Sequence, residues 1–200
     1  MTGDLRATVD IGDATTVLLL APDLQEQSTD ACMAVLDGLG ERVDRVVPVT
    51  VTHDASEWLS LWEREVDDGP AVAACVNVDR TTRSTVETVD EPVVPVERVS
   101  DPTDLETIGR RVSDALQRAD EAGDSVGVAV HSLTGLLEHV DEPTGFKFVY
   151  TLGEVARRVD GVVVFHLDPN AHDDETVETF RIVCEAVVDA THGRSRSVDR

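Results

Sequence analysis

Two hydrophobic patterns alternate along this chain: short apolar runs, and longer stretches in which apolar residues recur at every third or fourth position. The short runs predict strands at 15–21, 45–52, 71–76, 125–130 and 161–167, with weaker candidates at 93–99 and 186–189. The periodic stretches predict helices at 28–39, 56–66, 101–122, 133–140, 147–159 and 173–185. Nearly continuous apolar strands separated by amphipathic helices are typical of a parallel sheet covered on both faces, so the pattern predicts a doubly wound α/β domain.

Local signals refine the ends of several elements. Ser28 and Asp173 are candidate N-caps, because their side chains can accept hydrogen bonds from the first free backbone N–H groups of a helix. Pro48 lacks a backbone N–H and so favours a position near the sheet edge for the strand 45–52, while 186–189 is expected as a last edge strand. The length of 200 residues fits one domain at 14–190, with a flexible N-terminus at 1–13 and a polar tail at 191–200.

The segment 21–28, with the sequence APDLQEQS, lies between the first predicted strand and the first predicted helix. This is the setting of a phosphate-binding loop, G-x-x-x-x-G-K-[ST], and the spacing agrees. Ala21 and Glu26 stand at the two glycine positions, Gln27 at the lysine and Ser28 at the hydroxyl. A phosphate cradle needs glycines so that backbone N–H groups can approach the anion, and a lysine for its charge. Only the hydroxyl is kept, which predicts a degenerate nucleotide loop.

The chain is strongly acidic, with 40 Asp and Glu against 17 Lys and Arg, a net charge of -23 and a pI near 4.3. The acids are spread along the sequence and Lys147 is the only lysine. This composition resembles that of halophilic archaeal proteins, whose carboxylate-rich surfaces stay hydrated in concentrated salt. At molar salt the Debye length is about 3 Å, so the repulsion between these charges is largely screened.

Charge and hydropathy exclude two classes of partner. Phosphate contacts need clustered Lys or Arg, and no basic stripe interrupts the acidity until Arg194 and Arg196 near the C-terminus, so nucleic-acid binding is not expected. The sequence shows no signal peptide, and no apolar run approaches the roughly 20 residues that span a bilayer, so we expect a cytoplasmic protein without membrane insertion. Cys32, Cys75 and Cys184 are far apart without a C-x-x-C pair, which predicts buried thiols in a reducing compartment.

Several segments resemble the RecA superfamily, specifically its KaiC/RadA-like branch. The segment 49–59 (VTVTHDASEWL) resembles a strand and helix whose turn carries catalytic acids in that branch. The segment 125–137 (SVGVAVHSLTGLL) is similar to its Walker B strand, and 161–173 (GVVVFHLDPNAHD) to the next strand and turn. More narrowly, HSLTGLL followed by FHLDPNAHD resembles a haloarchaeal group of inactivated KaiC-like ATPases, sometimes called HTR-like, to which a role in signal transduction is ascribed. The resemblance covers about residues 15–190 and implies a mostly parallel RecA-like (P-loop NTPase-type) sheet flanked by helices.

The resemblance also implies where catalysis would take place, and those positions lack the required groups. Gln27 stands at the Walker A lysine. Thr52 and His53 stand where the catalytic acid is expected, and His131 replaces the Walker B aspartate that holds magnesium. Imidazole is a poor partner for a hard, oxygen-seeking ion. We therefore expect a pseudo-ATPase with no catalytic residue and no cofactor.

Histidines and carboxylates follow the carboxyl ends of the predicted strands, where ligands bind in open α/β sheets. The candidate metal ligands are two residues at strand ends and two in the following loop: His131, His166, Asp168 and His172. With His53 near by, they could hold zinc or another borderline ion. The simpler interpretation is that His166 and His172 hydrogen-bond loop backbone, while His53 and His131 fill the space of lost catalytic groups. Spacing alone does not set a tetrahedral geometry, so no metal is expected from it.

Three functional hypotheses follow. The leading one is a non-catalytic RecA/KaiC-like regulator or scaffold in haloarchaeal signal transduction, which acts through contacts with other proteins. A homo-oligomer is compatible with this hypothesis, because RecA-like domains commonly assemble edge to edge. The alternatives are a metal-dependent hydrolase that uses the histidines and aspartates at the strand ends, and a nucleotide sensor that binds without hydrolysis.

Overall fold

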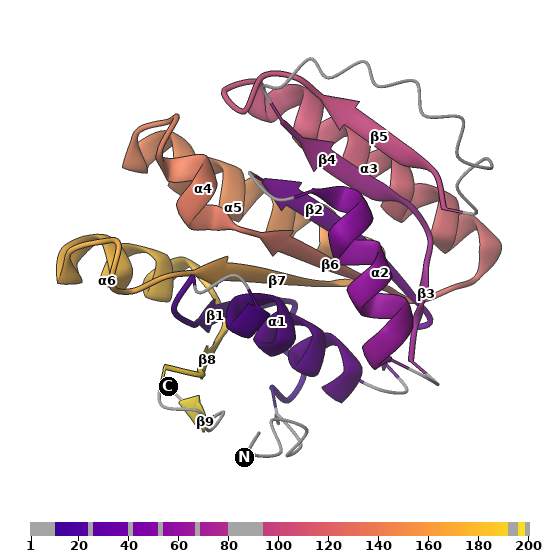
Figure 1. Ribbon diagram of the computed structural model, residues 1–200, viewed down its shortest axis with the longest axis horizontal. Coiled ribbons are helices and arrows are strands. Elements are labelled where there is room, and N and C mark those ends of the chain that lie inside the picture. Colours follow the sequence, from indigo (N-terminus) through magenta and orange to yellow (C-terminus); the bar gives the residue numbers. More distant parts are fainter. Residues whose placement is uncertain are drawn as a thin grey trace.

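A single sheet lies between two layers of helices (Figure 1) in the computed structural model, which describes residues 11–23, 26–39, 42–51, 54–66, 69–79, 94–191 and 196–198. The strands are β1 (Thr16–Leu20), β2 (Arg45–Val51), β3 (Ala71–Val72), β4 (Cys75–Val78), β5 (Val96–Val99), β6 (Val126–His131), β7 (Val162–Leu167), β8 (Ala186–Asp189) and β9 (Arg196–Val198). The helices are α1 (Glu26–Gly38), α2 (Ala55–Glu65), α3 (Leu105–Ala122), α4 (Leu133–Leu137), α5 (Glu142–Arg157) and α6 (Asp174–Val183).

The strand order is β5-β4-β2-β6-β7-β1-β8-β9, and β3 pairs with β2 beside this path. Every pairing is parallel except that of β8 with β9, so eight parallel strands carry one antiparallel strand at the end. The prediction of a mostly parallel, doubly wound α/β sheet is confirmed. The strand 186–189 is present but is not the last one, because β9, within the segment expected to be a polar tail, pairs with it.

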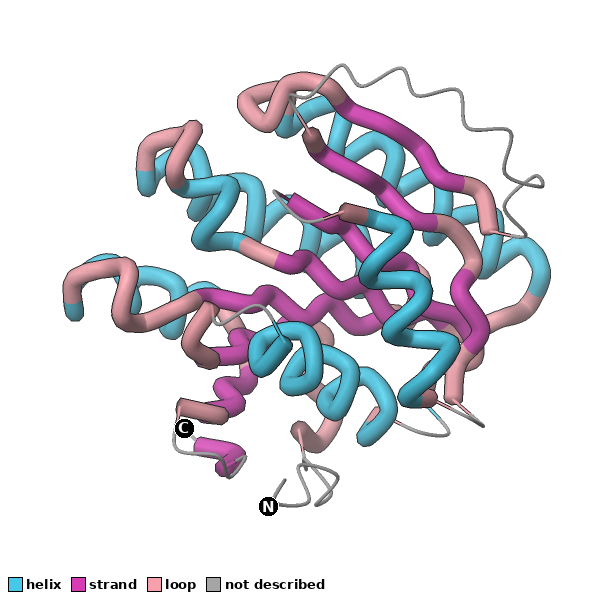
Figure 2. Tube along the Cα trace, viewed as in Figure 1, coloured by secondary structure: helices cyan, strands magenta, loops and turns pink. Residues whose placement is uncertain are grey.

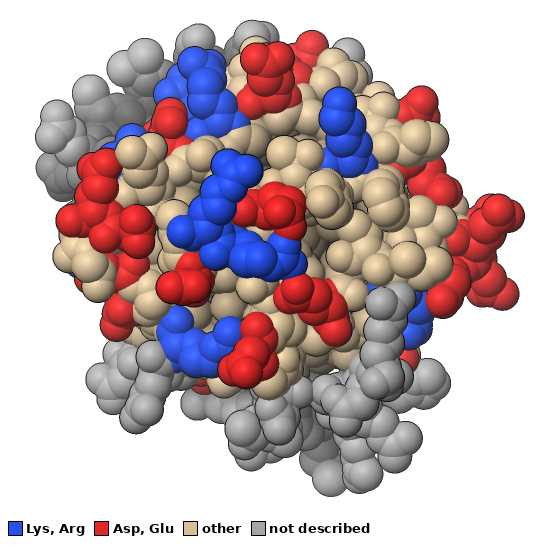
Figure 3. Space-filling view, turned by 180° about the vertical axis from the view of Figure 1, so that it is seen from behind, with Lys and Arg blue, Asp and Glu red and all other residues tan. Residues whose placement is uncertain are grey.

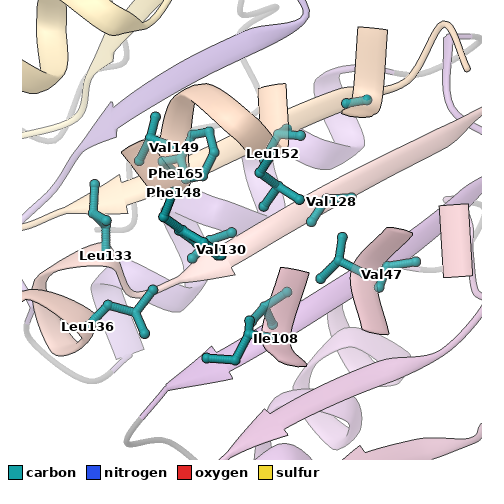
Figure 4. Packing of buried hydrophobic residues seen from close by; sticks show 14 of the residues in the cluster. Val47, Ile108, Val128, Val130, Leu133, Leu136, Phe148, Val149, Leu152 and Phe165 are labelled. Carbon is teal, nitrogen blue, oxygen red and sulfur yellow. The ribbon is translucent and has the colours of Figure 1, made fainter. Parts of the chain in front are cut away.

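Apolar side chains fill the space on both faces of the sheet. One core contains residues of α3, α4, α5 and α6 packed on β6 and β7; in Figure 4, Leu133 and Leu136 of α4 lie beside Val130, and Phe165 lies beside α5. The other core joins α1 and α2 to the opposite face, where it includes Ala129 of β6 and Val164 of β7. Figure 2 shows the two helical layers on either side of the strands. Each central strand is buried on both faces, which explains the uninterrupted apolar runs.

Polar side chains cap several helices, and two predicted boundaries change. The predicted cap of the last helix is confirmed, because Asp173 accepts a hydrogen bond from the backbone N–H of Thr176 at 2.8 Å. The predicted cap at Ser28 is wrong: α1 begins at Glu26, so Ser28 lies inside its first turn. The helix expected at 147–159 begins at Glu142 with Asp141 as its N-cap, and proline is accepted there because the first turn needs no N–H from it.

The expected edge position of Pro48 is also wrong, since β2 lies between β6 and β4. Arg45 donates its backbone N–H toward Ser125 on the β6 side, whereas Val46 accepts a bond from Ala73 on the other side. The backbone groups of alternate strand residues point to the same neighbouring strand, so the position of the missing N–H of Pro48 faces β3 and β4, as the backbone of Val46 does. The run predicted as one strand at 71–76 is interrupted there, between Val72 and Cys75. The proline therefore removes no ladder bond that the sheet would otherwise make.

Charged side chains of both signs are interspersed on the face shown in Figure 3, without a continuous basic stripe. Ion pairs join some of these charges in the structure: the carboxylate of Glu97 bonds both Arg111 at 2.8 Å and Arg118 at 3.1 Å. Among the described helices, none combines the length and the apolar character that a bilayer crossing would need. The three cysteines are free and buried as predicted, and burial raises the pKa of each thiol to about 12: Cys32, Cys75 and Cys184.

Candidate functional site

The residues singled out at strand ends meet at one edge of the sheet, beside the loop that follows β1. His131 is the last residue of β6, and His166 is the next-to-last residue of β7. Ala21 comes directly after β1, and Asp23 is the third residue beyond it. The three strands are neighbours in the order β6-β7-β1 and run parallel, so their carboxyl ends lie together, at the edge toward which the arrows of β6 and β7 point in Figure 1.

The imidazoles of His131 and His166 stack on one another at the centre of this edge. Their ring centroids are 4.9 Å apart with an angle of 21° between the planes, and both side chains are fully buried. The spacing follows from the sheet, because the two residues succeed the aligned pair Val130 and Phe165 and neighbouring strands lie about 4.8 Å apart. Side chains alternate between the faces, so both rings point to the face of α1. The backbone therefore fixes the stack.

Ser28 of α1 lies against this stack and is also fully buried. Its Oγ is 3.1 Å from Nε2 of His131 and donates to Oδ1 of Asp23 at 3.2 Å. Because a carboxylate can only accept, the hydroxyl of Ser28 donates its proton to Asp23. The oxygen of Ser28 therefore accepts a hydrogen bond from the Nε2–H of His131. Ser28 thus joins His131 at the end of β6 to Asp23 in the loop after β1.

The loop after β1 is tied to β7 and to the turn that follows it. The backbone oxygen of Ala21 lies 2.9 Å from Nε2 of His166. The backbone N–H of Ala21 donates to the backbone oxygen of Leu167 at 3.2 Å. The backbone N–H of Asp23 donates to Oδ2 of Asp168 at 2.9 Å. The other oxygen of Asp168 accepts from the backbone and side chain of Asn170. Both polar backbone groups of Ala21, and the N–H of Asp23, therefore have partners within the protein.

Thr134 of α4 connects a second group of polar residues at the same edge. Its Oγ1 accepts the backbone N–H of Asp168 at 2.9 Å and lies 3.2 Å from Nε2 of His172. Burial lowers the pKa of His172 below its ordinary value, although the carboxylates of Asp168 and Asp173 act in the opposite direction. His172 is thus part of a turn-stabilising network that favours its neutral form.

The structure brings some predicted site residues together and separates others. His131, His166 and Ser28 form one group, as described above. Asp168 and His172 lie beside this group: Asp168 bonds Asp23, and His172 contacts Thr134. Neither belongs to the three-residue group with metal-binding spacing. That group contains His131, His166 and Asp23. The two histidines were candidates from the sequence, whereas Asp23 was not. The remaining predicted positions fall outside the described residues, wholly or in their side chains: Glu26, Gln27, Thr52 and His53.

The donor atoms of this group converge closely. One nitrogen of each imidazole and one carboxylate oxygen of Asp23 lie within 4.8 Å of one another. Asp23 is half-buried, whereas both histidines are fully buried. Two imidazoles and one carboxylate are ligand types that suit zinc and related divalent ions.

Solved structures share this architecture. An ATPase from the type III secretion system of pathogenic bacteria has a TM-score of 0.57 and 11% identity, over 89% of this chain and 51% of that one. A Pyrococcus horikoshii OT3 protein, PH0250, has a TM-score of 0.57 and 10% identity, over 94% and 86% of the two chains. The uncharacterized Pyrococcus horikoshii protein PH0321, in complex with an unknown peptide, has a TM-score of 0.56 and 12% identity, over 88% and 76%.

These similarities confirm the predicted RecA-like fold, and at such identities they show the fold alone. The chain spans about half the length of the secretion-system ATPase. No curated protein matches the sequence. A family model does match residues 14–190, and the chain therefore belongs to the family described as "Family of unknown function (DUF7504)".

Proposed function

We propose that this chain is a RecA-like pseudo-ATPase, which regulates or scaffolds other proteins in signal transduction and does not hydrolyse ATP. The observation that carries the proposal is the hydrogen bond from the backbone N–H of Asp23 to Oδ2 of Asp168, at 2.9 Å. Asp23 lies inside the degenerate loop 21–28, where an active relative uses backbone N–H groups to bind phosphate. In this chain a carboxylate of the protein accepts the hydrogen bond from that donor.

The charges around the loop oppose a nucleotide. Two carboxylates, those of Asp23 and Asp168, lie at the edge where phosphates would bind. A polyphosphate placed there would be repelled by both, and Gln27 offers no compensating charge at the position of the phosphate-binding lysine. We infer that binding of ATP is weak or absent in the folded protein.

The magnesium position is occupied by other interactions. An active P-loop enzyme holds magnesium with the loop hydroxyl and a Walker B aspartate. Ser28 has no exposed surface, donates its proton to Asp23 and accepts a hydrogen bond from His131. A magnesium ion at this oxygen would have to enter a fully buried position beside the imidazole of His131, and losing either hydrogen bond would cost about 1–3 kcal/mol where a partner is left unsatisfied.

Binding to other proteins is the function that we propose for this chain. Two large apolar side chains are more than half exposed on neighbouring helices, Tyr150 on α5 at 57% and Ile182 on α6 at 56%. The similar protein PH0321 was crystallised with an unknown peptide, which supports a peptide-binding use of this fold. The resemblance to inactivated haloarchaeal KaiC-like proteins supports a signalling context.

Hydrolysis is tested by phosphate release from ATP in molar KCl with magnesium. We expect the wild-type chain to match a protein-free blank. Ser28→Ala is the test variant, and His172→Gln, which alters a neighbouring network, is its matched control. Turnover by the wild type that disappears in Ser28→Ala and persists in His172→Gln would contradict the proposal, because it would show a working loop hydroxyl.

The regulatory role is tested by affinity capture at molar salt. The bait is the wild-type chain, the double variant Tyr150→Ser with Ile182→Ser, or the control Thr151→Ser, which changes an exposed neighbour on α5. We expect a stoichiometric protein partner that the wild type and the control retain. A chain that stays monomeric and captures the same background as an unrelated acidic protein would contradict a scaffolding role.

A further inference from the structure

We infer that Asp23, His131 and His166 form a binding site for one divalent ion of borderline character, with zinc as the representative member. The inference goes beyond the proposed function and does not depend on it, because a chain that binds zinc here could either bind or reject ATP. It rests on the convergence of three donor atoms within 4.8 Å, on the burial of both imidazoles, and on the hydrogen bonds that orient the two rings.

The backbone places both histidines before any ion arrives. His131 and His166 occupy adjacent positions on two central parallel strands, and the same strands hold the fully buried Val130 and Phe165. A ligand pair carried by strands loses little conformational freedom on binding, in contrast to a pair carried by surface loops. Much of the conformational entropy of the two histidines is therefore lost when the protein folds, and little remains to be lost when an ion binds.

Hydrogen bonds on Nε2 orient both imidazoles. A backbone carbonyl can only accept, so the contact of His166 Nε2 with the oxygen of Ala21, at 2.9 Å, puts the proton on Nε2. Ser28 donates its proton to Asp23, so its oxygen accepts from Nε2 of His131. In the neutral rings the lone pair is then on Nδ1. A histidine that ligates a metal commonly donates its other ring N–H to a carbonyl, a carboxylate or a water, which fixes the tautomer in this way.

The donor set selects the class of ion. Magnesium and calcium prefer oxygen ligands, and this group offers two nitrogens to one carboxylate. Two imidazoles with a carboxylate match the protein ligands of catalytic zinc sites and suit other first-row divalent ions. Three protein ligands leave a coordination position for water or for a group from a partner.

The three ligand side chains must adjust to hold one ion. Donor atoms around a tetrahedral zinc ion are about 3.3 Å apart, given bonds of about 2.0–2.1 Å. The observed limit of 4.8 Å exceeds this by at most about 1.5 Å, a difference that requires rotation of the half-buried Asp23 side chain together with a turn of the stacked imidazoles about their side-chain bonds. At low ionic strength the net charge of -23 also raises the local concentration of cations around the molecule.

Zinc binding is measured on the whole chain after treatment with a chelator, in molar KCl so that loose attraction to surface carboxylates is screened. We expect one equivalent of zinc, with an affinity at least tenfold weaker in Asp23→Asn and in His166→Gln, and unchanged in the control His172→Gln. Circular dichroism checks that each variant folds. Asp23→Asn changes a half-buried loop residue, so it gives an answer even where a variant of a buried histidine does not fold.

Cobalt(II) serves as a spectroscopic probe of the same site. We expect visible bands of a nitrogen- and oxygen-ligated ion, which zinc displaces and which Asp23→Asn weakens. A thiolate charge-transfer band would overturn the proposal, since it would place the ion on a cysteine. Less than a tenth of an equivalent of zinc after loading, or equal binding by wild type and Asp23→Asn, would overturn it too. These readouts use no nucleotide, so their failure is distinct from a failure of the pseudo-ATPase proposal.

Discussion

Asp168 accepts the backbone N–H of Asp23 at 2.9 Å, across 145 positions of sequence. The bond closes the loop after β1 onto the turn after β7, and it gives a backbone donor of the loop 21–28 a carboxylate of the protein as its partner. The pairing explains two features together: why the loop can hold its shape without a ligand, and why a ligand of negative charge is not expected to enter.

We expect Asp168→Ala to destabilise the protein by about 1–3 kcal/mol, because a hydrogen bond to a charged group is lost and donors are left unsatisfied. The affected donors are the backbone N–H groups of Asp23 and Asn170. Chemical denaturation followed by circular dichroism measures the change. The exposed Asp174, at the start of α6, provides the control Asp174→Asn, which should shift the free energy of unfolding by no more than about 0.5 kcal/mol. Equal effects of the two substitutions would show that the Asp168 contact does not stabilise the loop.

Two glycines in helices should respond in opposite directions to alanine. A Cβ at Gly153 of α5 would overlap Cγ2 of the buried Thr16, whose Oγ1 already accepts the backbone N–H of Glu185. We expect Gly153→Ala to cost about 1–3 kcal/mol through overpacking. A Cβ at Gly109 of α3 would be 3.9 Å from its nearest neighbour, in Phe148, so Gly109→Ala should stabilise by about 0.4–1 kcal/mol. Thermal melts of both variants make the comparison, and a stable Gly153→Ala protein would contradict the packing of α5 on β1.

The stability of the protein should fall as the pH drops below about 6.5. Burial lowers the pKa of His172 in the folded chain from 6.5, so the unfolded chain binds a proton there more readily. The contribution of the neutral imidazole is therefore fully present above 6.5 and is lost as the pH falls toward the folded pKa. Urea midpoints between pH 7.5 and pH 5.5 measure this slope. We expect His172→Gln to reduce it; an equal slope in the wild type and this variant would rule out His172 as its source.

Salt should stabilise the fold strongly. A net charge of -23 favours expansion, and screening by molar salt removes most of this repulsion. We expect the melting temperature to rise from dilute to molar KCl. Sucrose at matched osmolality controls for a general solute effect and should raise it less. A melting temperature that does not depend on KCl would contradict the interpretation of the acidic surface as an adaptation to salt.

Hydrophobic patterning predicted most of the sheet. The runs at β1, β6 and β7 have few polar interruptions because these strands are buried on both faces, and Asp173 was found as a cap because capping is local. The break between β3 and β4 was missed, since the run 71–76 is apolar throughout and the break depends on pairing with β2.

The site was predictable only in part. The position of His131 and His166 follows from their place at strand ends, and the parallel sheet turns that place into contact. Asp23 carried a weak signal, as an acid three residues beyond a strand. Its role depends on Asp168, on Ser28 and on the stacked rings, which only the folded chain brings to it. Hydrophobic periodicity cannot predict side-chain contacts of this kind.

The central claim is tested most directly by calorimetric titration of the wild-type chain with magnesium and ATP in molar KCl. The arrangement of Asp168, Asp23 and Ser28 predicts no saturable heat up to millimolar nucleotide. A stoichiometric isotherm with micromolar affinity, weakened by Ser28→Ala, would contradict it, because the loop would then bind phosphate despite its own carboxylates.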